Sequence, residues 1–219
     1  HILVWSVNGN YIRTNIDEEF TNFGLYHKEY FGYIPKNEFW IDHGTKDGEE
    51  HFFIDNLLAL HKFLGEGMNY EEARVKADET EKCERAKSKL AKKVKKSKDL
   101  MKEVHKKLLK EYSTYVSVWI INGELVRDLL FIGFTEGGHD KVYSFIPNHE
   151  VWLDDQLSAK ERKLILLHEL TERALMSKEW GYNKAHREAS KIEFYYRHHK
   201  KELDKKLRKA IKKQKTKGL

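Results

Sequence analysis

The sequence repeats itself in two halves, and this repeat limits the folds that the chain can adopt. Three segments of the first half match three segments of the second half, in the same order. They are VWSVNGNYIR (4–13) and VWIINGELVR (118–127), FGYIPKNEFWID (31–42) and YSFIPNHEVWLD (143–154), and NYEEARVKADETE (69–81) and GYNKAHREASKIE (181–193). The only two prolines, Pro35 and Pro147, lie at matching places in the two halves. The sequence therefore predicts a tandem duplication.

Each half begins with a pattern that is typical of strands. An alternating apolar run leads to an Asn-Gly dipeptide, at Asn8-Gly9 and again at Asn122-Gly123. Asn-Gly between apolar runs is the strongest short signal for a β-hairpin. A third strand is expected to end at the Ile-Pro step, and EFWID or EVWLD forms a fourth. These signals predict a small antiparallel sheet in each half.

Two helices are expected after each sheet. The first is predicted over about 49–65 and 158–177, and the second begins near 70 and near 182, because apolar residues recur there at helical spacing. A sheet followed by a helix pair is an α+β arrangement. We therefore predict an α+β fold in which each half repeats this plan.

A strongly basic stretch joins the halves. No Gly or Pro occurs between Glu71 and Tyr112, and apolar or small residues recur there with a heptad-like spacing. This stripe consists of Leu90, Val94, Ser97, Met101, Val104 and Leu108. It predicts one long basic helix that packs on the C-terminal helix or on another chain in a homo-oligomer. The predicted domains are a first repeat at 1–82, this connector at 83–113 and a second repeat at 114–219.

The charge distribution suggests possible partners and a compartment. The chain carries a formal net charge of +6, and its basic excess lies mainly in 85–110 and in 200–217. Such patches attract nucleic acid, so the basic helix and tail are candidates for that partner. A single cysteine, Cys83, indicates a reducing compartment. No membrane span or signal peptide is expected, so we predict a cytoplasmic protein. Dense charge of both signs is typical of thermophilic sources.

The segment LLHELTERALM at 166–176 carries the candidate chemistry. His168 and Glu172 are four residues apart, so they project from one face of a helix. His186 lies near the start of the next helix, which is expected to pack antiparallel to the first. Two histidines and one glutamate form a ligand set for catalytic zinc, with an open position for water. Glu169 would then be the general base acting on that water.

The first half serves as an internal comparison for this site. Alignment of the two halves places Asn56, Leu57, Leu60 and Arg74 opposite His168, Glu169, Glu172 and His186. Because the first half does without these polar groups, the fold does not require them, and this favours a functional site. The alternative is structural: Glu169 and Glu172 would form ion pairs with Arg173 and Arg187.

Three further residues are candidates to support the ligands. Arg173 and Glu193 lie on the two helices that carry the predicted site, and His139 lies in TEGGHD before a strand. A surface loop is the favoured interpretation for His139. Glu193 has a counterpart in Glu81 of the first half, which favours a structural cap or salt bridge for both.

The motifs of the second half resemble those of a protein family met in phages, mobile elements and archaea. The resemblance rests on IPNHEVWLDD, on HELTERALM and on GYNKAHREASKIE, and it spans about 135–193 with a degenerate copy at about 21–81. It implies that His168, Glu169, Glu172, Arg173 and His186 form one site. A looser similarity to zincin-like metallohydrolases rests on His168 and Glu169, but Glu172 replaces the second histidine of HExxH.

These observations lead to one favoured function and two alternatives. The favoured function is zincin-like, metal-dependent hydrolysis, with peptides as a candidate substrate and zinc or another divalent metal as cofactor. The first alternative is a nucleic-acid-binding or assembly protein of a virus or mobile element. The second is a non-catalytic scaffold of two repeats.

Overall fold

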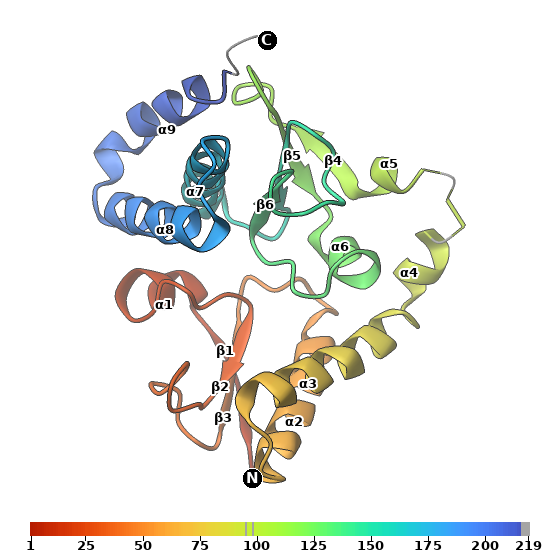
Figure 1. Cartoon of the computed structure of the whole chain (residues 1–219). Helices are drawn as coiled ribbons and strands as arrows, with labels where there is room; N and C mark the ends of the chain where they lie inside the picture. Colours follow the sequence, from red (N-terminus) through yellow and green to blue (C-terminus); the bar gives the residue numbers. More distant parts are fainter. Residues whose placement is uncertain (95, 98, 216–219) are drawn as a thin grey trace. The chain divides into compact units, whose positions relative to one another are not determined.

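The computed structural model describes residues 1–94, 96–97 and 99–215 (Figure 1). It has two small β-sheets with helices packed against them, so the predicted α+β class is confirmed. None of the described helices is long and apolar enough to cross a membrane.

The chain divides into two compact units that do not follow simple sequence order. The first unit consists of His1–Leu100 and Glu124–Gly133, and the second consists of Met101–Gly123 and Phe134–Leu219. These bounds differ from the boundaries expected from the repeat, because residues 101–113 belong to the second unit rather than to a separate connector.

The sheet of the first unit has three strands. They are β1 (Leu3–Val7), β2 (Phe23–Leu25) and β3 (Glu38–Asp42), in the order β1-β3-β2. β1 runs parallel to β3, with Trp5 opposite Trp40, and β2 runs antiparallel to β3. β1 is therefore an edge strand, and its other edge is not paired with any described strand.

The sheet of the second unit has four strands in the order β4-β5-β7-β6. They are β4 (His105–Leu108), β5 (Ser117–Ile121), β6 (Gly137–His139) and β7 (Glu150–Asp154). β5 runs parallel to β7, with Trp119 opposite Trp152, while β6 is antiparallel to β7. The additional strand β4 pairs antiparallel with β5. It covers the edge of β5 that corresponds to the unpaired edge of β1 in the first sheet.

The Asn-Gly hairpin predicted for the first half is wrong, and a helix stands in its place. Asn8 caps the helix α1 (Gly9–Asn15), because its side chain accepts a hydrogen bond from the Tyr11 backbone N–H. Gly9 is required because a Cβ there would collide with the Asp42 carboxylate. Because β3 runs parallel to β1, the chain between these strands must cross over from one end of the sheet to the other, and a tight turn cannot do this.

The same correction applies to the second half. Asn122 and Gly123 lead into the helix α6 (Gly123–Leu129), and a Cβ on Gly123 would collide with the Asp154 carboxylate. Each sheet is therefore mixed, and the prediction of purely antiparallel sheets is wrong. An Asn-Gly dipeptide suits a helix start as well as a hairpin turn, because Asn is a good N-cap.

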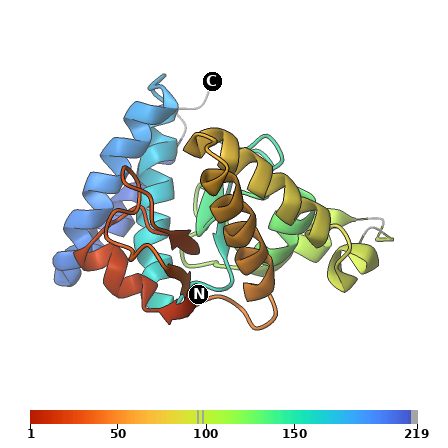
Figure 2. The same ribbon diagram turned by 90° about the horizontal axis from the view of Figure 1, so that it is seen from below.

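The two helix pairs begin and end close to the predicted positions. Their bounds are α2 (Glu50–Gly65), α3 (Tyr70–Arg85), α7 (Ala159–Met176) and α8 (Tyr182–His198). Side-chain caps mark two of the starts: Asn69 accepts from the Glu72 N–H, and Ser158 accepts from the Glu161 N–H. Each pair packs side by side (Figures 1 and 2).

The predicted long basic helix over 83–113 is wrong. After α3 the chain forms α4 (Lys89–Val94), α5 (Leu100–Val104) and then β4. The Ser88 hydroxyl restarts the helix by accepting from the Ala91 N–H. Four of the six residues 91–96 are lysines, and like charges three or four apart destabilise a continuous helix. Positions 95 and 98 of the predicted helix lie outside the described residues.

The heptad stripe consequently does not form one seam. Val94 and Val104 are buried, but they lie on two separate short helices, and Leu108 lies on a strand. The expected C-terminal helix is also broken: α8 is followed by a 3-10 turn, Lys200–Glu202, and by α9 (Leu203–Lys212). No oligomer interface follows from this stripe.

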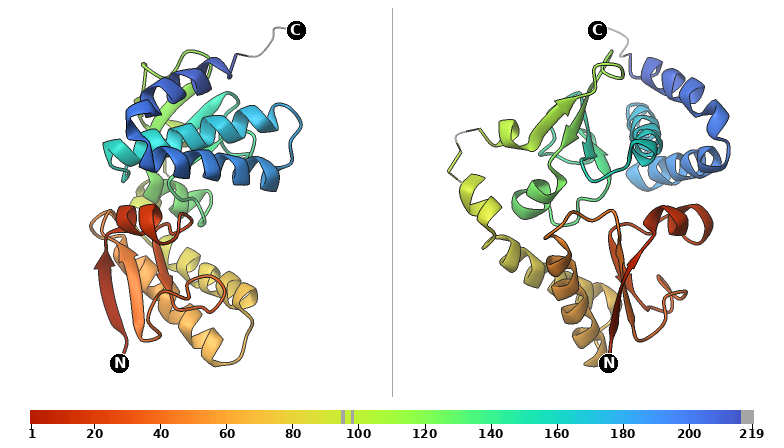
Figure 3. Two further views of the ribbon diagram at one scale, coloured as in Figure 1. Left: turned by 90° about the vertical axis from the view of Figure 1, so that its left-hand side faces the viewer. Right: turned by 180° about the vertical axis from the view of Figure 1, so that it is seen from behind.

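The sheet of the first unit buries different residues on its two faces. Phe39 and Ile41 belong to one buried cluster with Phe53 of α2, whereas Trp40 packs against another cluster, which contains Ile12 of α1. This alternation places α2 and α1 on opposite sides of the sheet (Figure 3).

In the second unit the helix α7 lies against the sheet, with α8 and α9 packed on it (Figure 1). Val118 and Leu153 of the sheet, Leu167 of α7, and Leu203 and Leu207 belong to one buried cluster. Burying one such aliphatic side chain contributes about 1.5–3 kcal/mol. Because this core encloses α7, the polar residues of α7 are held inside the unit.

Candidate metal centre

The helix α7 is buried on most of its surface, and this decides where its polar residues lie. All seven residues from Leu164 to Leu170 are buried, His168 and Glu169 among them, and Glu172 is 3% exposed. Polar groups inside a protein need partners, since an unpaired buried polar group costs free energy. The partners of these side chains come from α8 and β6.

The ligand atoms of the three residues predicted to bind metal lie close together. His168 Nε2 lies 3.1 Å from His186 Nδ1, His186 Nδ1 lies 2.8 Å from Glu172 Oε2, and His168 Nε2 lies 3.7 Å from Glu172 Oε2. α7 supplies His168 and Glu172 one turn apart, and the first turn of α8 supplies His186. The structure therefore brings together the three residues that the sequence singles out as ligands.

These distances suit a tetrahedral ion as well as they suit hydrogen bonds. Ligand atoms at 2.0–2.1 Å from a tetrahedral zinc ion lie about 3.3 Å from one another. The three observed separations, 2.8, 3.1 and 3.7 Å, lie around that value. The triangle thus has the size that a zinc ion needs, with two nitrogens and one oxygen as donors.

His168 is held by a second contact that fixes its proton. Its Nδ1 lies 2.9 Å from Glu193 Oε2, so that nitrogen donates and leaves Nε2 facing the cluster. Glu193 in turn accepts from Arg197, whose Nη1 donates to Glu161. The chain of contacts is buried, and Glu193 takes part both in the salt bridge that the sequence favours and in the contact with His168.

His139 is not on a surface loop, so that interpretation is wrong. It ends the strand β6 and is 0% exposed, with Nε2 3.0 Å from Glu172 Oε1. The Lys141 backbone N–H, 3.2 Å away, can only donate to Nδ1, so the His139 proton lies on Nε2 and is donated to Glu172. His139 therefore holds one oxygen of Glu172 and leaves Oε2 to face the other two histidines.

Two glycines bring β6 close to α7. A Cβ on Gly137 would lie 2.8 Å from the Ile165 side chain, and one on Gly138 would lie 2.7 Å from the Tyr143 ring. Only glycine permits this approach without moving its neighbours. The GGH triplet was the sequence signal for a buried His139, because two glycines beside a strand indicate close packing.

Glu169 lies beside the triangle without a partner of its own. It is 9% exposed, and no residue in the described part of the chain donates a hydrogen bond to its carboxylate. Its oxygen lies within 4.8 Å of ligand-type atoms of His139 and Glu172. These three residues form a second candidate metal group, but the proton on His139 Nε2 favours the first group.

Charges inside the cluster shift several pKa values. Burial opposes ionisation of Glu172, but hydrogen bonds from three histidines outweigh it and hold the pKa of Glu172 well below its usual range. Burial also opposes the charged form of His168, yet hydrogen bonds to Glu172 and Glu193 raise its pKa well above 6.5. Burial raises the pKa of Glu169. Glu172 is thus a carboxylate, and Glu169 binds protons more readily than an exposed glutamate.

The ion-pair alternative predicted from the sequence differs from the observed contacts. Arg173 binds Asp140 and not a glutamate of α7, with Nε 2.6 Å from Oδ1 and Nη2 3.0 Å from Oδ2. Its Nη1 also donates to Gln214. Arg187 is exposed and forms no ion pair with the described residues. Arg173 is therefore a link between α7, the loop after β6 and the end of α9.

The first unit holds a related network without the cluster. At the positions that match Glu161, Glu193 and Arg197, the residues Glu49, Glu81 and Arg85 form the same kind of buried contacts: Arg85 binds Glu81 at 2.6 Å and Glu49 at 2.9 Å. Asn56 takes the place of His168 and donates to Glu81. Within the described residues, metal-type groups occur only in the second unit. The Glu–Arg–Glu contacts are therefore structural, and the histidine cluster is an addition to them.

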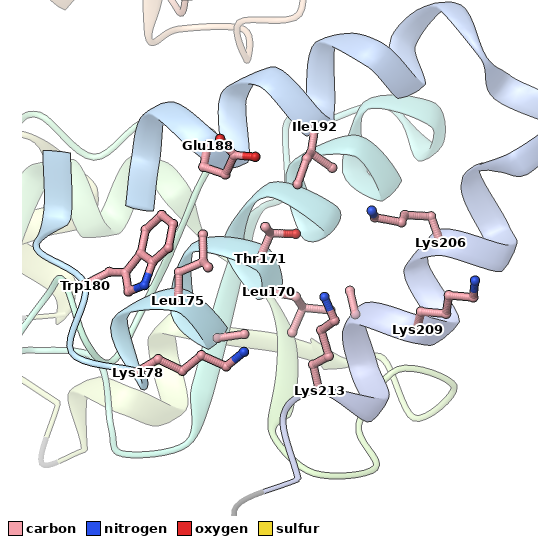
Figure 4. A pocket seen from close by; sticks show the side chains of 12 residues that line it. Leu170, Thr171, Leu175, Lys178, Trp180, Glu188, Ile192, Lys206, Lys209 and Lys213 are labelled. Atoms are coloured by element: carbon pink, nitrogen blue, oxygen red, sulfur yellow. The ribbon is translucent and has the colours of Figure 1, made fainter. Parts of the chain in front are cut away.

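The second unit also has a pocket on the opposite face of α7 (Figure 4). It lies between α7, α8 and α9, and its volume is about 280 Å³. Leu170 and Thr171 of α7 line it, so it is separate from the face that carries His168 and Glu172.

No protein-family model, no curated protein and no solved structure matches this chain.

Proposed function

We propose that the second unit is a metal-dependent hydrolase that binds one zinc ion through His168, Glu172 and His186. The observation that carries the proposal is the triangle of His168 Nε2, Glu172 Oε2 and His186 Nδ1, whose sides match the spacing of ligands around tetrahedral zinc. Two histidines and one glutamate are a donor set of catalytic zinc sites, which keep a fourth position open.

A bound zinc ion of this kind lowers the pKa of its water to about 7. Glu169 is the candidate proton acceptor, because its carboxylate is buried beside the triangle and has no hydrogen-bond donor among the described residues. His186 is the most exposed of the three ligand residues, with 34% of its side chain accessible, so substrate and water approach from its side. Peptides are the substrate class to test first.

Two neighbouring residues position the ligands. Glu193 accepts the Nδ1 proton of His168, so Nε2 is the nitrogen that would bind zinc after it releases its own proton. His139 donates to Glu172 Oε1 and holds the carboxylate in place. Both act through the ligands and do not touch the reacting atoms.

We also infer that the two halves arose by tandem duplication. In support, β1, β3 and β2 have the same order and directions as β5, β7 and β6. The paired residues also correspond, with Trp5 opposite Trp40 and Trp119 opposite Trp152. On this account the second copy gained the histidine cluster, or the first copy lost it.

Substitution of Glu169 tests the proposed chemistry. The Glu169→Gln variant should keep its zinc, because Glu169 is not one of the three ligands, and it should lose peptide hydrolysis by about 100-fold or more. Zinc content and cleavage of a mixed peptide library are measured on the same samples. The matched control is Glu188→Gln, which changes a carboxylate of α8 that is outside the cluster. Unchanged hydrolysis in Glu169→Gln would remove Glu169 from the mechanism.

A further inference from the structure

The pocket between α7, α8 and α9 combines an apolar wall with a ring of positive charge. Leu170, Leu175 and Ile192 supply part of the apolar wall, and Lys178, Lys206, Lys209 and Lys213 also line it. Lys206, Lys209 and Lys213 follow one another at spacings of three and four, so they lie on one face of α9. In Figure 4 the ammonium groups of Lys178, Lys206 and Lys213 turn toward the space between the helices.

These four lysines form no ion pairs among the described residues, and the Lys206 ammonium group lies 5.6 Å from the centroid of the Tyr196 ring. None of them has a carboxylate within 4.0 Å in the described part of the chain, whereas Lys163 binds Asp204 of α9 at 2.8 Å. Glu188 is the single acidic residue of the lining. Four lysines against one glutamate leave an excess of three positive charges around the pocket.

The first half has no lysine at the four matching sequence positions. At the offset that separates Pro35 from Pro147, the first half has Glu66, Val94, Ser97 and Met101 in place of the four lysines. Three of the four lysines belong to α9 or follow it directly, and the aligned stretch of the first half is divided between α4 and α5, so no equivalent lysine face exists there. Lysine side chains on one face of a helix are often only solvated, but here they surround a hollow with apolar walls.

We propose that this pocket binds a small amphipathic anion, namely a carboxylate or phosphate carried on a hydrocarbon body. The apolar walls favour the hydrocarbon and the lysines favour the anionic head. The volume of about 280 Å³ lies near the lower end of ligand pockets, which suits a medium-chain molecule.

A nucleic-acid strand is less well matched to the same lysines. Strand binding uses aromatic platforms for the bases along an extended basic groove. Trp180 is the single aromatic residue of the lining, and the Lys184 ammonium group lies over its ring at 4.1 Å. The occupied ring face and the enclosed shape favour a small ligand.

The test uses the full chain and three probes of equal chain length: decanoate, decyl phosphate and decanol. Trp180 lines the pocket, so its fluorescence reports binding, and the Trp180→Phe variant identifies its contribution. Saturable binding of one or both anions, with none of decanol, is expected below about 1 mM. Decanoate and decyl phosphate differ only in the head group, so their ratio identifies the preferred anion.

Charge removal provides the matched control. The double variant Lys206→Gln/Lys213→Gln should bind the anion at least about tenfold more weakly. Lys205→Gln/Lys212→Gln removes the same charge from α9 at exposed positions outside the lining, and it should bind as the unchanged chain does. Equal loss in both double variants, equal binding of decanol, or no saturation would each overturn the proposal. Binding of a single-stranded oligonucleotide in place of the anions, abolished by Lys206→Gln/Lys213→Gln, would also overturn it.

Discussion

At the scale of residues, the three proposed zinc ligands differ in role from the residues that position them. Glu193 belongs to the second kind, because it holds His168 Nδ1 at 2.9 Å. The Glu193→Gln variant should bind zinc about 10–100-fold more weakly, since such partners orient the ring of a ligand and raise its basicity. Competition with a chelator of known affinity measures this change.

The first unit supplies the control for this variant. Glu81 is buried and binds Arg85, as Glu193 binds Arg197, but no metal-type group lies beside it among the described residues. Glu81→Gln should lower the melting temperature and leave the zinc affinity unchanged. If both variants weaken zinc binding equally, Glu193 acts through general stability and not through His168.

Two aspartates are expected to give opposite pH dependence. Burial raises the pKa of Asp78 above 3.8, whereas two hydrogen bonds from Arg173 outweigh burial and lower the pKa of Asp140 below 3.8. The raised pKa of Asp78 stabilises the fold below pH 3.8 and loses this effect as pH rises through the folded value. The lowered pKa of Asp140 stabilises the fold above pH 3.8 and loses this effect as pH falls through the folded value.

Thermal unfolding of two variants at several pH values measures these opposite pH dependences of stability. Relative to the unchanged chain, Asp78→Asn should become less stable as pH falls from about 6 to about 2.5, and Asp140→Asn should become relatively more stable over that range. Each change is expected to be on the order of 1 kcal/mol. The same direction of change for both variants would contradict the assigned pKa shifts.

At the scale of elements, the two sheets differ in one covered edge. β4 pairs with β5, and the His105 ring stacks on Trp119 at a centroid distance of 4.3 Å. On β1 no described strand covers the equivalent edge, and Trp5 is 50% exposed. Trp119→Lys should therefore cost about 3 kcal/mol of stability, and Trp5→Lys less than about 1 kcal/mol. Thermal or denaturant unfolding measures both, and an equal loss would show that β4 does not stabilise β5.

The helix pairs could be predicted from the sequence, but the connections of the strands could not. The apolar runs and caps at Asn69 and Ser158 are local signals, and the helices α3 and α7 begin directly after them. Asn8-Gly9 is equally suited to a hairpin and to a helix start, and only the parallel pairing of β1 with β3 decides between them. Local patterns do not contain that long-range information.

The prediction of one long basic helix was wrong for a related reason. The absence of Gly and Pro permits a helix over the whole connector, but it does not reveal that His105–Leu108 can pair with β5. Tertiary pairing overrides helix propensity there. For the site, the spacing of His168, Glu172 and His186 identified the cluster, whereas the burial of His139 depends on how β6 packs against α7.

At the scale of the whole molecule, both units contain a buried Glu–Arg–Glu network, and one unit adds the histidine cluster. Arg85 contacts Glu49 and Glu81 in the first unit, and Arg197 contacts Glu161 and Glu193 in the second. Removing one partner of such a buried network costs about 3–5 kcal/mol. Variants in these networks therefore test folding, and among their members only Glu193, which also contacts His168, is expected to change zinc binding as well.

The most direct test of the central claim is the zinc content of the full chain after loading and removal of free metal. We expect about one zinc per chain, none in His186→Ala, and full content in Arg74→Ala, which changes the corresponding position of the first unit. His186 is partly exposed, so its removal should leave the fold intact. Absence of zinc from the unchanged chain, or equal content in His186→Ala, would contradict the assignment of His168, Glu172 and His186 as a metal centre.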